Sequence, residues 1–169
     1  MAAEKTLNDA FYDTLRDVLY AEKQALKACK KSAKAATHTE LKQAFEQHAQ
    51  ETEGQIDRLQ QIFELINRPA RAKTCEAMQG IISEMEEDLG DYGMSPAADA
   101  VIIGCGQAIE HYEIARYGTL ISWAKQLQLD DAATLLAETL EQEKNADALL
   151  TKIAEESVNA AAGGRSKAA

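Results

Sequence analysis

The sequence predicts an all-α protein, folded as one bundle of four long helices with an extra short helix between the second and the third. Proline, which breaks helices, occurs only twice, at Pro69 and Pro96. Alanine, leucine, glutamate, glutamine and lysine, all good helix formers, dominate the composition. Aromatic residues are 5% of the chain, fewer than a typical β-sandwich or barrel contains. The 169 residues make one ordinary domain, which we expect to occupy residues 1–158.

The first two long helices are expected over residues 6–35 and 40–67. In both, apolar residues recur at the three- and four-residue spacing of one helical face. The short break between them contains Thr37 and Glu40, which have the spacing of a capping box. The second helix is expected to stop before Pro69, because the residue that precedes a proline rarely adopts helical geometry.

A shorter amphipathic helix is expected over residues 73–89. Its apolar face is formed by Met78, Ile81, Ile82, Met85 and Leu89. The sequence Gly-Asp-Tyr-Gly at residues 90–93 then predicts a loop. A lone bundle need not bury this apolar face, so we expect the short helix to hold two chains together as a symmetric homodimer.

The third long helix is expected over residues 97–127, with Ser95 as its cap and Pro96 in its first turn. Asp130 is expected to cap the fourth long helix. Residues 159–169 consist mostly of alanine, glycine and serine, a composition that predicts a flexible tail.

The lengths of the connections predict how the helices are arranged. Short turns join the first helix to the second and the third to the fourth, so each pair is expected to form an antiparallel hairpin. A connection of about 29 residues separates the two pairs, and two hairpins joined by one long crossover form the ferritin-like topology. Another all-α bundle, such as a cytokine-like arrangement, fits the same spacing.

Composition argues against several functional classes. The net charge of −10 would repel a phosphate backbone, so we expect no nucleic-acid partner. No apolar run reaches the roughly 18 residues that span a bilayer, so we expect no membrane partner. The three cysteines, Cys29, Cys75 and Cys105, form no Cys-x-x-Cys motif. Unpaired thiols are typical of a reducing cytoplasm, where we expect the protein to reside.

Acidic residues lie near the middle of every long helix. In an antiparallel bundle the middles of the four helices meet at one level, so these side chains can converge. Buried carboxylates are rare unless they are paired or bind a metal, because like charges in the core repel each other. Two iron ions, or two manganese ions, bridged by carboxylates would remove that repulsion. The predicted ligands are Glu22, Glu51, Glu110, Glu113, Glu143 and Asp147.

Each of these acids, taken alone, is more simply explained as a solvated side chain. Glu22, Glu143 and Asp147 together favour a buried site, because apolar residues flank them one turn away on both sides. The periodicity does not choose between Glu110 and Glu113, since the third helix is apolar on several faces. His48 lies on the apolar face of the second helix and is either a ligand or a core histidine with a backbone partner.

Four segments resemble the bacterial YciE/YciF family: residues 19–27 (LYAEKQALK), 45–59 (FEQHAQETEGQIDRL), 108–120 (AIEHYEIARYGTL) and 138–147 (ETLEQEKNAD). The resemblance covers nearly the whole chain except the tail. It implies a ferritin-like, stress-associated protein of the cytoplasm, a homodimer, and a di-iron site related to that of rubrerythrin.

The chain departs from the usual ferritin-like pattern Glu-x-x-His. Gly54 and Ala146 stand three residues after Glu51 and Glu143. Gln55 occupies a position where many relatives are expected to have histidine, so His48 and Gln55 are kept as further candidate ligands.

The leading hypothesis is a rubrerythrin-like di-iron oxidoreductase that reduces peroxide or oxygen during stress, with an electron donor that the sequence does not identify. In this hypothesis Glu51 and Glu143 bridge the metals, and the remaining acids hold their outer sides. Two alternatives stay open: a non-enzymatic structural stress protein with an empty or degenerate site, and an iron-storage protein, which would need a closed shell of subunits.

Overall fold

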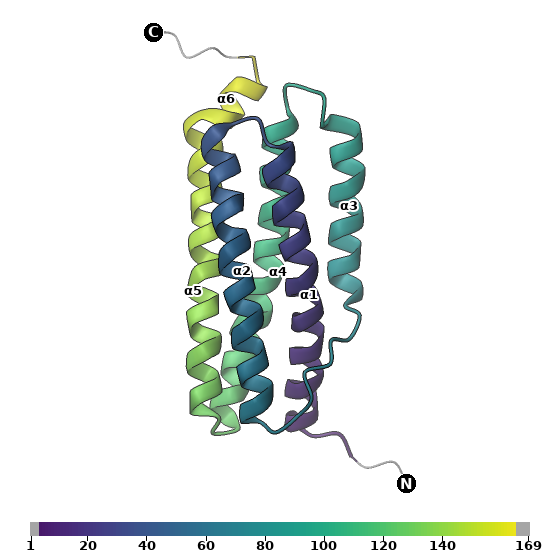
Figure 1. Cartoon of the computed structure of the whole chain (residues 1–169), viewed down its shortest axis with the longest axis vertical. Coiled ribbons are helices and arrows are strands. Elements are labelled where there is room, and N and C mark those ends of the chain that lie inside the picture. The colour runs from purple at the N-terminus through teal and green to yellow at the C-terminus, as the bar shows by residue number, and fades with distance from the viewer. Residues whose placement is uncertain (1–3, 165–169) are drawn as a thin grey trace.

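The computed structural model describes residues 4–164, and every regular element in that range is a helix, which confirms the all-α prediction (Figure 1). A 17-residue helix lies between the two hairpins, and the last long helix continues through a π-helical turn into a final short helix. The elements are α1 (Leu7–Ala35), α2 (Thr39–Leu65), α3 (Glu76–Tyr92), α4 (Ala98–Gln126), α5 (Asp130–Ile153), the π turn (Ala154–Val158) and α6 (Asn159–Ala162).

The four long helices form the bundle, and α3 lies outside it. Helix α1 packs against α2 and α4, and α5 packs against the same two helices, so that α1 and α5 are diagonally opposite. Helix α3, on the right of Figure 1, covers α4 and part of α1. The pairs α1–α2 and α4–α5 are antiparallel hairpins, joined by the long connection that carries α3. This is the predicted ferritin-like topology.

The turn between α1 and α2 is held by an acid from another helix. Because α2 begins at Thr39, Thr37 lies one residue outside its N-cap, and the predicted capping box of Thr37 with Glu40 is wrong. The backbone N–H and hydroxyl of Thr37 instead donate to the Asp99 carboxylate, at 2.8 and 2.6 Å. The N–H of His38 donates to the same carboxylate at 3.0 Å, so Asp99 ties the turn to the start of α4.

The ends of the other helices also differ from the predictions. Helix α3 continues to Tyr92 through the predicted loop, because the chain turns only at Gly93. The N-caps of α4 and α5 are Ala97 and Leu129, and neither makes a side-chain cap, so the predicted cap at Asp130 is wrong. Ser95 lies two residues before the N-cap of α4, and its hydroxyl accepts from the Ala97 backbone N–H at 3.2 Å.

The described part of the predicted tail is structured up to residue 164. Asn159–Ala162 is helical and residues 163–164 form a turn, because the π turn carries the direction of α5 forward. Residues 165–169 lie outside the described part of the chain.

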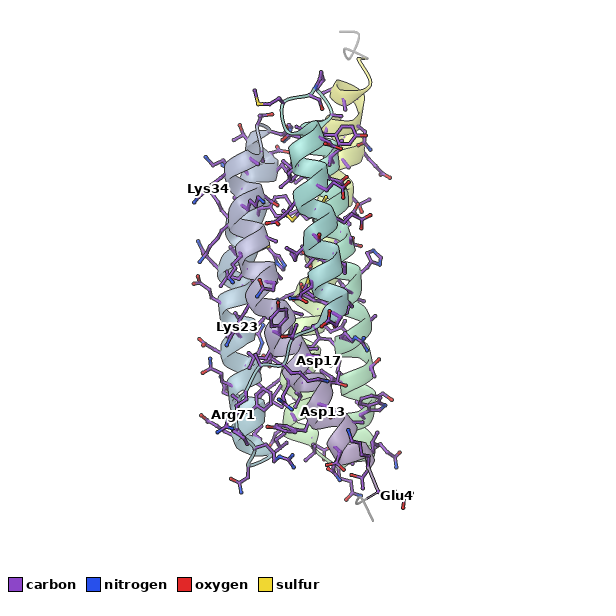
Figure 2. All side chains as sticks on the ribbon, turned by 90° about the vertical axis from the view of Figure 1, so that its right-hand side faces the viewer. Glu4, Asp13, Asp17, Lys23, Lys34 and Arg71 are labelled. Atoms are coloured by element: carbon purple, nitrogen blue, oxygen red, sulfur yellow. The ribbon has the colours of Figure 1, made fainter. Side chains whose placement is uncertain are left out.

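The connection before α3 is anchored along the lower half of α1. The Tyr12 hydroxyl donates to the Pro69 carbonyl at 3.0 Å, and the Arg16 side chain donates to the Arg71 carbonyl at 2.9 Å. Lys73 pairs with Asp17 at 3.5 Å. Figure 2 shows Arg71 at the level of Asp13 and Asp17 on this side of the molecule. These contacts position α3 at the edge of the bundle.

The apolar face of α3 is used within the chain. Met78 and Met85 are fully buried, in a cluster with Ala21, Ala25 and Cys105 and with further residues of α1 and α4. Ile81, Ile82 and Leu89, the other residues of this face, are half-buried. The bundle thus covers much of the face on which the expected dimer depended, and the homodimer stays a prediction with a weaker argument. No helix in residues 4–164 combines the length and apolar character needed to cross a membrane.

The core of the bundle has two apolar layers with a polar layer between them. The lower cluster includes Phe11, Leu59 and Tyr117, and the upper cluster includes Phe45 and Leu150. Between the two clusters lie nearly all the buried polar side chains of the described chain, Ser32 alone lying elsewhere. This polar layer consists of Glu22, His48, Thr52, Gln55, Glu110, Glu113, Thr139 and Glu143.

Candidate metal centre

The polar layer contains two groups of possible metal ligands, and each of the four long helices contributes to at least one of them. Within each group, one ligand atom from every residue lies within 4.8 Å of the others. All members are at most 5% exposed. Glu143 belongs to both groups. The upper group is His48, Glu110 and Glu143, and the lower group is Glu22, Glu113 and Glu143.

Helical periodicity explains why α4 serves both groups. Glu110 and Glu113 lie three residues apart, so they project from the same face at successive levels. Glu110 reaches the upper group and Glu113 the lower one. The sequence left these two residues as alternatives, and the structure places both in the polar layer.

His48 is surrounded by three carboxylates. Its Nε2 lies 3.2 Å from Glu110 Oε1 and 3.3 Å from Glu143 Oε2, and its Nδ1 lies 3.3 Å from Glu51 Oε2. Burial alone lowers the pKa of His48, but the hydrogen bonds to Glu110, Glu143 and Glu51 outweigh it and raise the pKa well above its usual value. Without a metal, these carboxylates therefore favour the protonated imidazolium form of His48. To bind a metal through Nε2 it must release that proton.

Glu22 is paired with a buried tyrosine. The Tyr117 hydroxyl, one turn beyond Glu113, donates to Glu22 Oε1. Burial, and then the nearby Glu143, raise the pKa of Glu22 well above its usual value, although the Tyr117 hydrogen bond opposes this shift. Burial, and then the neighbouring Glu22, also raise the pKa of Tyr117. The tyrosine therefore stays a donor that orients the carboxyl group.

The acids of α4 also hold protons more tightly than exposed acids do. Burial raises the pKa of Glu110 to about 8, against the hydrogen bond from His48. Burial, and then the charges of Glu22 and Glu143, raise the pKa of Glu113 well above its usual value. Without a cation, these raised pKa values favour the protonated, neutral form of the carboxyl groups.

Several acceptors in this layer have no donor. Both oxygens of Glu113 lack a hydrogen-bond partner, as do Oε2 of Glu22, Oε2 of Glu110 and Oε1 of Glu143. Buried polar atoms are nearly always satisfied, and these atoms can only accept while their groups are ionised. Cations that prefer oxygen and imidazole ligands, such as iron and manganese, would satisfy several of them at once. The residues present therefore fit a metal centre.

A polar contact between α2 and α5 fixes the orientation of Gln55. The Arg58 guanidinium donates to Gln142 Oε1, and also to Thr139 Oγ1 at 2.9 Å. Because a guanidinium can only donate, the oxygen of Gln142 must face Arg58. Gln55 then presents its Nε2 to that oxygen at 3.3 Å, and its own Oε1 remains buried with no donor. Gln55 Oε1 is thus a neutral, unpaired acceptor in the polar layer.

Two predicted ligands lie outside both groups. Glu51 has a 30% exposed side chain, accepts from Gln47 at 3.0 Å and faces the outer nitrogen of His48. Asp147 accepts from Gln107 at 2.9 Å and lies 3.3 Å from the exposed His111. Glu143 therefore belongs to both ligand groups, whereas Glu51 belongs to neither and lies beside Nδ1 of His48.

Sequence reasoning kept His48 only as a further candidate and missed the pairing of Arg58 with Gln142. The signal for His48 was present, because it lies on the apolar face of α2 at the level of the acids. No local pattern marks Gln142, since its role depends on a contact with another helix.

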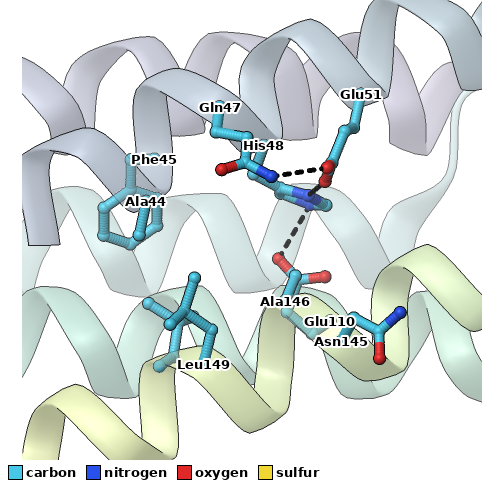
Figure 3. A pocket seen from close by; sticks show the side chains of 10 residues that line it. Ala44, Phe45, Gln47, His48, Glu51, Glu110, Asn145, Ala146 and Leu149 are labelled. Carbon is cyan, nitrogen blue, oxygen red and sulfur yellow. Dashed lines mark hydrogen bonds and ion pairs between the residues drawn. The ribbon is translucent and has the colours of Figure 1, made fainter. Parts of the chain in front are cut away.

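A pocket of about 90 Å³ leads from the surface to the upper group, between α2 and α5 (Figure 3). Its inner end is formed by His48 and Glu110, with Glu51 beside them. Exposed Gln47 and Asn145 lie at its outer edge. The remaining walls are apolar and are formed by Ala44, Phe45, Ala146, Leu149 and Leu150.

The chain is similar to known proteins over most of its length. The family model described as "Domain of unknown function (DUF892)" matches residues 6–163. Protein YciF of Escherichia coli (strain K12) is 44% identical over 156 residues, which cover 92% of this chain and 94% of YciF.

Solved structures agree with this similarity. The crystal structure of the E. coli stress protein YciF matches with a TM-score of 0.87 and 43% identity, over 92% of this chain and 99% of that chain. The structure described as "YcfI, a putative structural protein from Rhodopseudomonas palustris" matches with a TM-score of 0.85 and 39% identity, over 89% and 97% of the two chains.

Proposed function

Since the chain belongs to the DUF892 family and is a homologue of the stress protein YciF, we propose that it is a stress protein whose polar layer binds two redox-active metal ions and reduces peroxide or oxygen there. The predicted resemblance to the YciE/YciF family is confirmed by the 44% identity over 156 residues. The metal and the reaction are the proposal, with iron as the first candidate and manganese as the second.

The observation that carries the proposal is the set of buried carboxylate oxygens without a donor. Two ions of charge +2 would compensate the four glutamates of the polar layer, and the ligand groups already overlap at Glu143. A purely structural core would be more stable with apolar residues here, because ionisable groups lose hydration when they are buried.

The donor set assigns a position to each residue. His48 and Glu110 would hold the upper ion, Glu22 and Glu113 the lower ion, and Glu143 would lie between them. When bound, two ferrous ions supply two electrons, which with two protons convert hydrogen peroxide to two water molecules.

Glu51 orients His48 and links it to the solvent. Its carboxylate lies 3.3 Å from Nδ1, so it keeps the proton on that nitrogen and leaves Nε2 free to bind a metal. Because the Glu51 side chain is 30% exposed, it can also exchange protons with water. Glu51 thus supports the upper group as an orienting carboxylate.

On the lower side, Tyr117 orients Glu22 and closes the layer. Its hydroxyl donates to one oxygen of Glu22 and leaves the other free. The fully buried rings of Tyr117 and Phe63 belong to the lower cluster, and Phe45 belongs to the upper one. The two clusters keep water from the ends of the polar layer, which leaves the pocket between α2 and α5 as the approach that the described structure offers.

Metal binding by the purified protein tests this proposal. Metal-free protein titrated with ferrous ion under anaerobic conditions should bind two ions per chain, and the loaded protein should consume peroxide faster than free iron, with a new absorption band. The variant Glu143→Gln should lower metal affinity at least about tenfold, because the bridge has lost its charge. Glu141→Gln, an exposed change on the same helix, is the matched control.

Three outcomes would separate the alternatives. A protein that binds no metal favours a structural role, which is the role that the R. palustris relative is described as having. A protein that binds metal but treats peroxide no faster than free iron does contradicts the proposed reaction. Particles of many subunits that take up many ions per chain would favour storage.

A further inference from the structure

We propose that the pocket between α2 and α5 binds a short-chain alkyl hydroperoxide, with its oxygen atoms at the inner end and its alkyl group against the apolar walls. The pocket adjoins the site of the proposed function, on which this proposal rests, because His48 and Glu110 belong both to its lining and to the upper ligand group.

The inner end of the pocket can bind an O–H group. Glu51, whose side chain is 30% exposed, presents carboxylate oxygens there, as Figure 3 shows, and Glu110 lies at the same end. A hydroxyl or hydroperoxyl proton can donate to such an oxygen.

The walls of the pocket have no role in binding hydrogen peroxide alone. Phe45 and Leu150 are buried beside the pocket, and Leu149 is 39% exposed at its edge. Ala44 and Ala146, on opposite helices, leave the space between these larger side chains free. An alkyl group placed there would cover apolar surface that now meets water, which is favourable.

The size of the pocket limits the alkyl group. An apolar cavity of about 150 Å³ holds one benzene molecule, so a pocket of about 90 Å³ that is open on one side suits a molecule of roughly four to six non-hydrogen atoms. tert-Butyl hydroperoxide falls within this limit. Cumene hydroperoxide, with its phenyl ring, exceeds it.

The charge of the pocket favours a neutral head group. Glu51 and Glu110 line it, and Glu143 lies just behind them. The cationic group at this end, His48, is already paired with all three carboxylates, so a carboxylate or phosphate ligand would add to an excess of negative charge. A hydroperoxide is neutral at physiological pH, donates one hydrogen bond and carries an alkyl group. It therefore matches the polar end, the apolar walls and the charge together.

Binding can be tested without turnover. Metal-free, ¹⁵N-labelled protein is titrated with tert-butanol, an unreactive molecule with the same alkyl group and one hydroxyl. The side-chain amide signals of Gln47 and Asn145 should shift and saturate, whereas that of Gln107, which faces Asp147 and Thr151, should not. Pivalate, an anion of similar shape, should bind at least tenfold more weakly. Absence of a saturable shift, or equal binding of pivalate, would overturn the proposal.

Pocket-filling variants provide the second test. Ala146→Leu on α5 and Ala44→Leu on α2 fill the pocket from opposite sides, so the result does not depend on one variant folding well. Each should abolish the tert-butanol shifts. Ala148→Leu, an exposed change outside the pocket on α5, should keep them. Retention of the shifts in both filled variants would contradict the proposed location.

Turnover then connects the pocket with the reaction. The O–O bond of tert-butyl hydroperoxide breaks to give tert-butanol and water, with two protons from solvent and two electrons from the two ferrous ions of the proposed function. The ratio of tert-butyl hydroperoxide to hydrogen peroxide consumption should fall about tenfold in Ala146→Leu, and cumene hydroperoxide should be a poor substrate for the unaltered protein. An unchanged ratio overturns this inference. If the unaltered protein binds tert-butanol but reduces neither tert-butyl hydroperoxide nor hydrogen peroxide, the proposed function is overturned instead.

Discussion

Glu113 is the acid of the polar layer with the least support from its neighbours. Both of its oxygens lack a donor, and the charges that act on it most strongly, those of Glu22 and Glu143, are of the same sign. The charge of His48 favours the ionised form of Glu113, but less strongly than burial and the charges of Glu22 and Glu143 oppose it. The metal-free protein therefore keeps Glu113 in the core at a cost in stability.

The replacement Glu113→Gln should stabilise the metal-free protein at neutral pH, by roughly 1 kcal/mol, because the amide has nearly the same shape without the charge. The same change should weaken metal binding. Urea unfolding at pH 7 with and without metal measures both effects, and Glu138→Gln, an exposed change on α5, is the control. Lower stability of the metal-free variant would mean that Glu113 has partners that the structure does not contain.

The stability of the metal-free protein should fall as the pH rises. A carboxyl group whose pKa is raised in the folded state binds protons more tightly there than in the unfolded chain. Its stabilising contribution is therefore complete below about pH 4.3, the pKa of a glutamate in the unfolded chain. For Glu110 that contribution is lost as the pH rises to about 8, its pKa in the folded protein. His48, also raised, adds a loss that begins above about pH 6.5. Unfolding measured from pH 4.5 to 8.5 checks the sign, and a rising curve would contradict it.

Removal of the Tyr117 hydroxyl should lower the stability of the metal-free protein more than that of the metal-loaded protein. Tyr117→Phe leaves Glu22 Oε1 buried without its donor, which costs about 1–3 kcal/mol. A bound ion would compensate part of this loss. Thermal melts of both forms measure the difference, and Tyr20→Phe, for which the structure records no hydrogen bond, is the control. Equal losses in the two forms would argue that Glu22 does not contact the metal.

At the level of the helices, Gly106 is a glycine of α4 at which an added Cβ would crowd side chains of two other helices. A Cβ placed there would lie 3.0 Å from Phe45 Cζ and 3.2 Å from Leu150 Cδ1, which brings α4 against α2 and α5 just above the ligand groups. At Gly104, two residues earlier, a Cβ would meet no atom within 4 Å. The two glycines therefore test how closely the helices must pack to hold the polar layer.

Gly106→Ala should destabilise the protein by about 1–3 kcal/mol, because the added methyl group forces Phe45 or Leu150 to move. Gly104→Ala should stabilise it by up to about 1 kcal/mol, since alanine favours the helix and the space is free. Opposite signs in urea unfolding are expected. The same sign for both variants would show that α4 can shift to accommodate the methyl group.

The helices could be predicted from local patterns, and their ends could not. Apolar periodicity and the two prolines are sufficient to locate four long helices and one shorter one. The α1–α2 turn depends on Asp99, which is distant in sequence, so the pair Thr37 and Glu40 suggested a capping box that does not form. Helix α3 passes through the predicted loop because Gly90 and Asp91 are followed by no proline until Pro96.

Across the entire bundle, the candidate site depends on the level at which four helices meet. The sequence predicts this level from the positions of the acids along each helix, and the convergence of Glu22, Glu110, Glu113 and Glu143 agrees with it. It does not predict the rotation of each helix, which turns Glu51 and Asp147 away from the ligand groups and His48 into them. Rotation is set by packing between helices, for which one sequence contains little information.

The proposed function requires that the polar layer hold two metal ions with Glu143 between them. Anomalous X-ray diffraction from crystals of the loaded protein, at the iron or the manganese edge, would locate these ions. We predict two peaks per chain, one among His48, Glu110 and Glu143 and the other among Glu22, Glu113 and Glu143. A polar layer without peaks in protein saturated with metal, or peaks only at Glu51 and Asp147, would contradict this arrangement.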